Sequence, residues 1–280
     1  MKISIITPVY NAVSTIEKTI LSVITQAIKS ELEYIIIDGG SNDGTLEIIH
    51  RYADKIDILI SEKDNSIYDA MNKGISRASG DIIGIINADD WYNDKALQII
   101  EDIFLRESKI DIIYSSLYNY FNGQYLNTFI PGNLDNLLFK FTLNHPSCFV
   151  KRAVYEKIGL FDLNYSIAAD YDFIFRAYLY GFCFHYVETP LASYSLNGFT
   201  GQSWNKFIEI SESWRVASSF AKQTSKDLVS KRQRFYLVWI TKELLTFIPK
   251  KFIKPSIAKD IKDKFRKAIG SLPSDQYGVW

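Results

Sequence analysis

Runs of apolar residues alternate with helix-forming segments over residues 1–90, and this alternation limits the fold more than any other feature of the chain. The runs lie at 2–9, 34–37, 56–61 and 81–87, and their apolar residues are not confined to every second position. Strands that are apolar on both faces are typical of a parallel sheet covered by helices on both sides. We therefore predict an α/β protein whose ligand-binding edge lies at the carboxyl ends of these strands.

The segments between the runs predict helices. Residues 14–29, 45–52 and 67–78 carry apolar side chains at helical spacing. Ser14 is followed three residues later by Glu17, which is the capping-box pattern. We therefore predict that Ser14 caps the first helix.

After residue 110 the alternation weakens. Residues 111–120 and 125–130 flank Asn122-Gly123 and predict a β-hairpin. The remaining predicted elements are a short helix over 133–141, a strand over 147–150, helices over 151–158 and 170–180, extended chain over 182–195 and mostly helical chain over 203–248.

Composition excludes several classes of protein. The 280 residues have a formal net charge of zero, with 32 basic and 32 acidic side chains, which excludes a generally basic nucleic-acid-binding surface. The two cysteines, Cys148 and Cys183, are too few for a disulfide framework. No apolar run approaches the ~20 residues that span a bilayer, and Pro8 comes too early for a signal-peptide core. We therefore expect a cytoplasmic protein.

The charge is unevenly distributed along the chain. Residues 221–270 hold 14 Lys/Arg against 4 Asp/Glu, whereas the remainder holds 18 against 28. The acidic body is suited to cations, and the basic segment to an anionic surface. The apolar and basic run 235–267 predicts either a core helix with a solvated basic end or a helix on the anionic inner face of the plasma membrane.

The fourth apolar run ends in Asn87, Ala88, Asp89 and Asp90. Adjacent carboxylates cannot both enter an apolar core without a partner. Oxygen ligands of this kind are suited to Mg²⁺ or Mn²⁺ that also binds substrate phosphates. The same residues are typical of a turn with a helix cap, so the pattern alone leaves both interpretations open.

Other polar clusters also have two interpretations. Asp38 begins a loop to Thr45 that is either a flexible helix-capping loop or a backbone that approaches a nucleotide. The run 61–74 is dense in polar groups at a strand-to-helix junction, as a capped, solvated helix start also is. Asp170 opens an apolar helix either as a cap or as a general base, and His145 is either structural or catalytic.

Taken together, these clusters resemble the motifs of family 2 glycosyltransferases of the GT-A fold, in particular bacterial enzymes of O-antigen, capsule or exopolysaccharide assembly. The resemblance covers roughly residues 1–200. The matching motifs, in the family's order, are Thr7-Pro8-Val9-Tyr10-Asn11 and the segments 38–45, 61–74, 87–90 and 168–176.

The resemblance implies a Rossmann-like, mostly parallel sheet flanked by helices. It implies a GT-A domain over residues 1–200 and a helical basic C-terminal extension over 201–280. The domain would consist of a nucleotide-sugar-binding half, 1–110, and an acceptor-binding half, 111–200.

The resemblance also implies a role for each matching residue. Asp89 matches the metal-binding carboxylate of the Asp-x-Asp motif, which implies Mn²⁺ or Mg²⁺ as cofactor. Asp170 matches the catalytic base, His145 lies on the acceptor side, and Asp38 matches the carboxylate that binds a uracil-type base. The full set of residues implied to line the nucleotide and donor pocket is Thr7, Pro8, Tyr10, Asn11, Asp38, Asp64, Asp69, Lys73, Asn87, Ala88 and Asp90.

The chain departs from the family pattern at two positions. Asn87 stands where many relatives have the first Asp of Asp-x-Asp, which removes one charge from the metal site. Ala169 stands where others have Glu before the base. The Gln-x-x-Arg-Trp motif of processive synthases is absent, which favours addition of one sugar per encounter.

The implied activity is inverting transfer of a hexosyl or N-acetylhexosaminyl group from a nucleotide-sugar, UDP-linked by preference, to a lipid-linked glycan. One alternative, prompted by Asn87, is a catalytically weak nucleotide- or glycan-binding module of the same fold. Another is a nucleotidyltransferase, although the Gly-rich motif followed by Lys is missing after the first strand. We expect no nucleic-acid partner.

Overall fold

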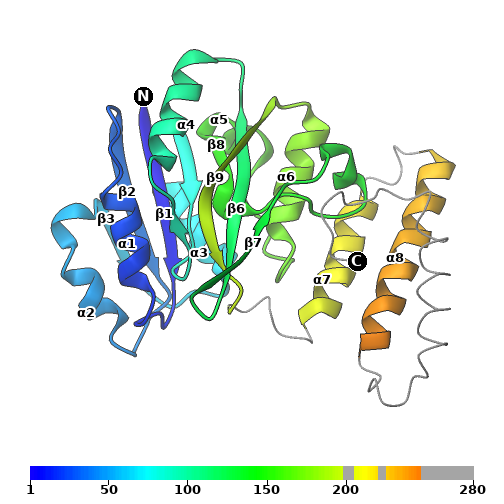
Figure 1. The fold of residues 1–280 in the computed structure, drawn as a ribbon, viewed down its shortest axis with the longest axis horizontal. Coiled ribbons are helices and arrows are strands. Elements are labelled where there is room, and N and C mark those ends of the chain that lie inside the picture. The colour runs from blue at the N-terminus through cyan, green and yellow to red at the C-terminus, as the bar shows by residue number, and fades with distance from the viewer. Residues whose placement is uncertain (198–204, 220–224, 247–280) are drawn as a thin grey trace. The chain divides into compact units, whose positions relative to one another are not determined.

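The structure is a computed structural model that describes residues 1–197, 205–219 and 225–246 (Figure 1). The chain divides by its internal contacts into two units. The first consists of Met1–Pro131 and Leu143–Gly198, and the second of Gly132–Thr142 and Phe199–Trp280. Every residue of the candidate site lies in the first unit.

The first unit combines a nine-stranded sheet with helices. Its strands are β1 (Lys2–Val9), β2 (Glu31–Asp38), β3 (Ile58–Ser61), β4 (Ile82–Ile85), β5 (Trp91–Tyr92), β6 (Ile112–Phe121), β7 (Gln124–Phe129), β8 (Phe149–Lys151) and β9 (Phe184–Ser195). Its helices are α1 (Ile16–Ile24), α2 (Thr45–His50), α3 (Ile67–Arg77), α4 (Ala96–Arg106), α5 (Arg152–Ile158) and α6 (Ala169–Tyr180), with short 3₁₀ turns η1 (Ala53–Lys55) and η3 (His145–Ser147).

The strand order is β3-β2-β1-β4-β8-β6-β9-β5, with β7 paired to β6. Strands β3, β2, β1 and β4 are parallel to one another. Strand β8 is antiparallel to both β4 and β6, and β5 is antiparallel to β9. The predicted α/β class with a helix-flanked sheet is confirmed, and the fully parallel part is the half formed by the first four apolar runs.

Helices cover both faces of the parallel half (Figure 1). Ile3 and Ile5 of β1 pack in one core with apolar side chains of α1 and α4. On the opposite face, α3 lies so close to β1 that a Cβ on Gly74 would be 2.4 Å from the Ile6 Cγ2 atom. This close approach fixes α3 on the sheet.

The predicted cap of the first helix is wrong. Helix α1 begins at Ile16, and its N-cap residue is Thr15 rather than Ser14. The amides of Thr15 and Ile16 both donate to the Ala12 carbonyl, so a turn precedes the helix. Glu17 accepts a hydrogen bond from the Tyr52 hydroxyl at 2.7 Å instead of closing a capping box.

Most other predicted elements of the first unit lie within a few residues of those in the structure, including the hairpin of β6 and β7. Strand β5 and helix α4 were not predicted. Strand β5 has only two residues, which is too short for a periodic pattern to reveal.

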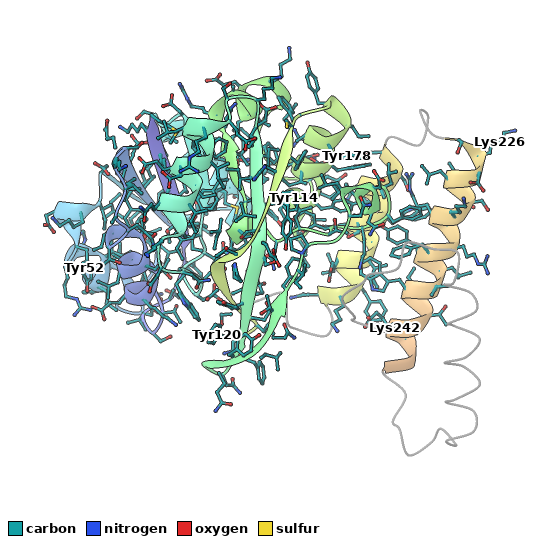
Figure 2. The ribbon with its side chains drawn as sticks, turned by 45° about the horizontal axis from the view of Figure 1, so that its top comes forward. Tyr52, Tyr114, Tyr120, Tyr178, Lys226 and Lys242 are labelled. Carbon is teal, nitrogen blue, oxygen red and sulfur yellow. The ribbon has the colours of Figure 1, made fainter. Side chains whose placement is uncertain are left out.

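The second unit contains η2 (Leu134–Leu138), α7 (Asn205–Ser219) and α8 (Lys226–Thr246). The short helix predicted over 133–141 is this 3₁₀ segment. The core of the second unit includes Phe139, Ile210 and Phe235. Figure 2 labels Lys226 and Lys242, near the two ends of α8. Among the described residues, no helix combines the length and the apolar character that crossing a bilayer requires.

A buried carboxylate joins the amino ends of the parallel strands. Glu33 of β2 accepts hydrogen bonds from the Ser4 hydroxyl at 2.5 Å and from the Ser79 amide at 2.8 Å. Burial disfavours the charged form of Glu33, but the hydrogen bonds from Ser4 and Ser79 outweigh it and lower the pKa to about 2. Lys2 also lies 3.1 Å from this carboxylate.

Replacing Glu33 with Gln is expected to lower the free energy of unfolding at pH 7 by about 1.5–3 kcal/mol, the usual contribution of hydrogen bonds to a charged group. The folded-state pKa lies below the ordinary value of 4.5, so this stabilisation is complete above pH 4.5 and is lost as the pH falls toward 2. Urea unfolding at several pH values measures both effects. The matched control is Glu31→Gln, which alters an exposed partner of Lys2; an equal effect of both variants would contradict the prediction.

Candidate active site

The loops that follow β1 and β2 are bonded to each other. The Asn11 amide donates to the Ser41 hydroxyl at 2.8 Å, and the Asn42 amide donates to the Asn11 side-chain oxygen at 2.9 Å. Asn11 has φ of 48°, a left-handed conformation that Asn tolerates better than most residues. The two loops therefore form one structured edge at the carboxyl ends of these strands.

Asp38 is fully buried at the end of β2. Its carboxylate accepts from the Ser41 hydroxyl at 2.5 Å, the Ser61 hydroxyl at 2.6 Å, and the amides of Gly40 and Ser41. A carboxylate has about four lone-pair positions, and these bonds occupy them. Asp38 thus holds its own loop in shape, and its predicted contact with a nucleotide base stays a prediction.

An exposed aromatic ring lies beside a bare stretch of backbone at this edge. Tyr10 is 64% exposed, and a Cβ on Gly39 would be 3.4 Å from its ring and 3.2 Å from an Asp64 carboxylate oxygen. Because Gly39 has no side chain, the Tyr10 ring and the Asp64 carboxylate can both lie close to its backbone, and the rest of the Tyr10 ring stays exposed. Thr7 and Pro8, also predicted to line the nucleotide, are buried.

The predicted donor residues on α3 and the loop before it form one charged cluster. The Lys73 ammonium lies 2.6 Å from Asp64, 2.8 Å from Glu62 and 3.7 Å from Asp69. Hydrogen bonds to Asp64 and Glu62 raise the pKa of Lys73, so it is charged at neutral pH. The Asp69 carboxylate also accepts from the Asn65 amide at 3.0 Å, a hydrogen bond that joins the first turn of α3 to the loop before it.

The segment after β4 contains a fully buried carboxylate. Asp90 accepts from the Ser195 amide at 2.9 Å and from the Asn87 side-chain nitrogen at 3.2 Å. Burial, with the neighbouring charge of Asp89, raises the pKa of Asp90 well above its usual range. Asp90 therefore orients Asn87 in this structure. Its predicted contact with the donor, like that of the buried Ala88, stays a prediction.

Asn87 and Asp89 fit a hard divalent cation. The side-chain oxygen of Asn87 is buried and has no hydrogen-bond partner among the described residues. Burial raises the pKa of Asp89, and a bound cation would favour its charged form. The described part of the chain has no group of three or more His, Cys, Asp or Glu that could hold a metal. Two oxygen donors, one of them a carboxylate, suit an ion such as Mg²⁺ that takes its remaining ligands from substrate phosphates and water.

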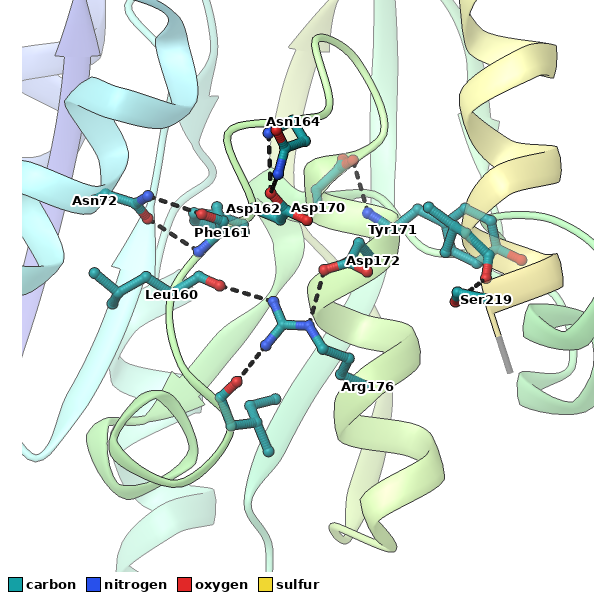
Figure 3. Close-up of polar contacts among 12 residues, drawn as sticks. Asn72, Leu160, Phe161, Asp162, Asn164, Asp170, Tyr171, Asp172, Arg176 and Ser219 are labelled. Atoms are coloured by element: carbon teal, nitrogen blue, oxygen red, sulfur yellow. Dashed lines mark hydrogen bonds and ion pairs between the residues drawn. The ribbon is translucent and has the colours of Figure 1, made fainter. Parts of the chain in front are cut away.

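Asp170 lies in the first turn of α6. Its Oδ1 atom accepts from the Tyr171 amide at 2.8 Å (Figure 3) and lies 3.3 Å from the Tyr68 hydroxyl. The Oδ2 atom is 3.9 Å from His145 Nδ1. Burial lowers the pKa of His145 to about 4, so this imidazole is neutral at pH 7 and does not neutralise the carboxylate.

The predicted site residues thus lie in local groups at the strand ends and at the start of α6. Sequence reasoning paired Asp170 with no other residue, and the structure places His145 beside it. It also missed Tyr68 and Asn72, although their i, i+4 spacing on a predicted helix was a signal that they share a face. Ser195, which bonds Asp90, gave no local signal because the two residues are far apart in sequence.

Comparison with known proteins gives consistent matches. The family model described as Glycosyl transferase family 2 matches residues 4–159. A PGL/p-HBAD biosynthesis glycosyltransferase of Mycobacterium bovis is 30% identical over 206 residues, covering 71% of this chain and 78% of that protein. Glycosyltransferase AglE of Haloferax volcanii is 37% identical over 91 residues, covering 31% of this chain and 30% of that protein.

Solved structures share the fold at low sequence identity. S. aureus TarS 1-349 in complex with UDP-GlcNAc matches with a TM-score of 0.64 and 16% identity, over 96% of this chain and 82% of that one. The chain spans about half of the longer TarS structure, 49%. Mannosyltransferase PcManGT from Pyrobaculum calidifontis, in complex with GDP-Man and Mn²⁺, matches with a TM-score of 0.64 and 15% identity, over 95% of this chain and 80% of that one.

Proposed function

Because this chain belongs to glycosyl transferase family 2, we propose that it moves one sugar from a nucleotide-sugar to a hydroxyl of a lipid-linked glycan in bacterial surface polysaccharide synthesis, with inversion at the sugar. The observation that carries the proposal is that the first unit holds two acidic groups at different places, one after β4 and one at the start of α6. Asp89 and the Asn87 oxygen, which has no hydrogen-bond partner among the described residues, follow β4, and Asp170 at the start of α6 lies beside the neutral imidazole of His145.

The donor is proposed to be a UDP-sugar carrying a hexosyl or N-acetylhexosaminyl group. The exposed Tyr10 ring would stack on the base, with Asn11 holding the loop that borders it. The fold shared with TarS, which was solved in complex with UDP-GlcNAc, supports a nucleotide-sugar as the donor. The GDP-Man complex of PcManGT shows that the same fold also binds a guanine nucleotide, so the base is part of the test.

Asp89 and Asn87 are the residues that would hold Mn²⁺ or Mg²⁺. When bound there, such an ion supplies positive charge to the leaving diphosphate. Asp90 keeps the Asn87 amide oriented through its hydrogen bond. The Thr19 hydroxyl donates to the Asp90 carbonyl at 2.7 Å and ties this turn to α1.

Asp170 is proposed to act as the general base. As the acceptor oxygen bonds to the anomeric carbon, the bond from that carbon to the diphosphate oxygen breaks on the opposite face, and the hydroxyl proton moves to the Asp170 carboxylate. This single displacement inverts the anomeric centre without a covalent intermediate. The neutral His145 leaves the carboxylate charge available and would border the acceptor.

Thermal unfolding with UDP, GDP, CDP or ADP, each with and without Mn²⁺, tests the proposal. We expect a UDP-specific, metal-dependent stabilisation, worth about 2.7 kcal/mol at a hundredfold excess over Kd. Stabilisation by GDP in place of UDP would move the proposed donor to GDP-sugars. No response to any nucleotide would contradict the donor site, and release of pyrophosphate from UTP and a sugar phosphate would favour a nucleotidyltransferase instead. Tight UDP binding without hydrolysis or transfer would favour the binding module.

We further propose that the protein is cytoplasmic and binds peripherally to the anionic inner face of the plasma membrane through residues 235–267. On α8, Leu237 is 67% exposed, and Ile240 and Leu244 are also exposed at helical spacing. Residues 247–267 of this segment lie outside the described residues. An apolar helical face with nearby basic residues suits a membrane surface.

The full-length chain is expected to float with vesicles of anionic phospholipid and not with neutral vesicles. A variant with Leu237→Asn and Leu244→Asn should lose this flotation, because the apolar contact is removed while the basic residues stay. A matched control is Leu105→Asn, another exposed leucine in the first unit. Equal flotation of wild type and the double variant would contradict the membrane proposal.

A further inference from the structure

The chain between α5 and α6 leads directly into Asp170. Residues 159–168 contain no strand or helix, so the hydrogen bonds of this segment to its neighbours set where α6 begins. Hydrogen bonds reach it from α3 on one side and from α6 on the other (Figure 3). These contacts therefore bear on the position of the Asp170 carboxylate.

Asn72 of α3 holds the middle of this segment. Its side-chain nitrogen donates to the Phe161 carbonyl at 2.9 Å, and its side-chain oxygen accepts from the Phe161 amide at 3.0 Å (Figure 3). The side chain thus pairs with both backbone groups of Phe161, as a neighbouring strand would. An Asp side chain could accept but not donate here, and an Ala side chain could do neither.

Tyr68 lies one turn earlier on α3 and contacts the end of the segment. Its hydroxyl is 2.5 Å from the Ile167 carbonyl and 3.3 Å from Asp170 Oδ1. Its ring also contacts Phe161, with ring centroids 5.6 Å apart. One buried side chain therefore joins α3 to the middle of the segment, to its last residues and to the carboxylate itself.

Arg176 holds the other side. From α6 it donates to the Asp172 carboxylate at 2.8 Å, to the Leu160 carbonyl at 2.7 Å and to the Ile158 carbonyl (Figure 3). The segment is thus bonded to α6 near its start and to α3 at its middle and end.

Helix α3 is itself fixed on the sheet, so the segment that it contacts is held in place relative to the sheet. Gly74 brings it against β1 with no room for a side chain between them. On a neighbouring face, Asp69 and Lys73 contact the loop that carries Asp64. The same helix therefore bears the proposed donor residues and the contacts to the segment before Asp170.

We infer that Tyr68 and Asn72 are positioning residues that hold Asp170 in place for proton abstraction. The inference rests on the proposed function, in which Asp170 is the general base. Neither residue takes up the proton. They fix the backbone of the segment before Asp170, and the single hydrogen of the Tyr68 hydroxyl is shared between the Ile167 carbonyl and Asp170 Oδ1.

Release of UDP from a UDP-sugar, with water as the acceptor and Mn²⁺ present, provides the assay. The donor is whichever of UDP-glucose, UDP-galactose and UDP-N-acetylglucosamine reacts fastest. Tyr68→Phe and Asn72→Ala are each expected to lower kcat by about 10- to 100-fold, the scale for misplacement of a reacting group by about 1 Å. The donor KM and the UDP-induced thermal shift should stay unchanged, since the donor contacts remain. Tyr52→Phe is the matched control, because it removes a hydroxyl with a 2.7 Å hydrogen bond at a distant position.

Combination with Asp170→Asn separates positioning from a general structural role. If Tyr68 and Asn72 act through Asp170, adding either substitution to Asp170→Asn should lower kcat no further. Multiplied losses in the combined variants, or a donor KM that rises together with the fall in kcat, would overturn the inference. Full activity of Tyr68→Phe and Asn72→Ala while Asp170→Asn is inactive would also overturn it and leave the proposed function standing. Full activity of Asp170→Asn would instead overturn the assignment of the base.

Discussion

Replacing Asp170 with Asn is expected to lower sugar transfer by about 10²–10⁴-fold, the usual contribution of general base catalysis. The amide keeps the size and the hydrogen-bond acceptor of the carboxylate, but it cannot take the proton of the attacking hydroxyl. Donor binding should be unchanged, because the proposed donor contacts lie on β1, β2, α3 and the turn after β4. His145 Nδ1 lies 3.9 Å from the carboxylate, and its pKa of about 4 leaves the imidazole neutral and able to accept a proton. It lies in η3, however, and not at the position of the carboxylate at the start of α6.

The measurement is UDP release at saturating UDP-sugar and Mn²⁺, with UDP-induced thermal stabilisation measured on the same samples. The matched control is Asp162→Asn in the segment before α6, where the carboxylate accepts from Asn164 and not from any group on α3. We expect the control to keep its activity. Near-wild-type turnover of Asp170→Asn would show that another group takes the proton.

Replacing Asp89 with Ala is expected to remove Mn²⁺-dependent UDP binding and to lower transfer by at least about 100-fold, because charge stabilisation by a metal is worth several kcal/mol. Asn87 would be left as a single neutral oxygen donor. A neutral amide has no charge with which to hold a divalent cation in place of the missing carboxylate. The fold should survive, since burial raises the pKa of Asp89 and its charge therefore does not stabilise the protein.

Calorimetric titration of UDP with and without Mn²⁺ checks this prediction. Asp81→Ala is the matched control, because Asp81 lies just before the opposite end of β4 and bonds the Lys2 amide. Metal-dependent UDP binding that persists in Asp89→Ala would place the cation elsewhere.

The parallel half of the fold could be predicted because its strands are apolar on both faces. Residues such as Ile35 and Ile36 point to opposite sides of the sheet and are both fully buried. Periodicity could not predict β5, since two residues carry no period, and it placed the start of α1 too early. The hydrogen bonds of Thr15 and Ile16 to the Ala12 carbonyl form a turn there that no capping pattern indicates.

The hydrogen-bond partners of the candidate site's carboxylates could not be predicted either. The sequence pointed to polar residues at strand ends, but it could not show how each carboxylate is used. Asp38 accepts from the Ser61 hydroxyl at the end of β3, and Asp90 accepts from the Ser195 amide on β9. Such pairings depend on which distant strands become neighbours. Local spacing of residues does not contain that information.

The position of β5 in the sheet has a consequence for the order in which the protein assembles during synthesis. Trp91 and Tyr92 leave the ribosome soon after β4, but their strand partners are Ser193 and Ala192 on β9. A nascent chain that ends before residue 184 can already pair the parallel strands, yet it offers Asp90 no amide from Ser195. Because contacts distant in sequence form slowly, the turn that carries Asp89 is expected to mature last. A ribosome-bound fragment would then contain the paired parallel strands before the turn at Asp89 reaches its final conformation.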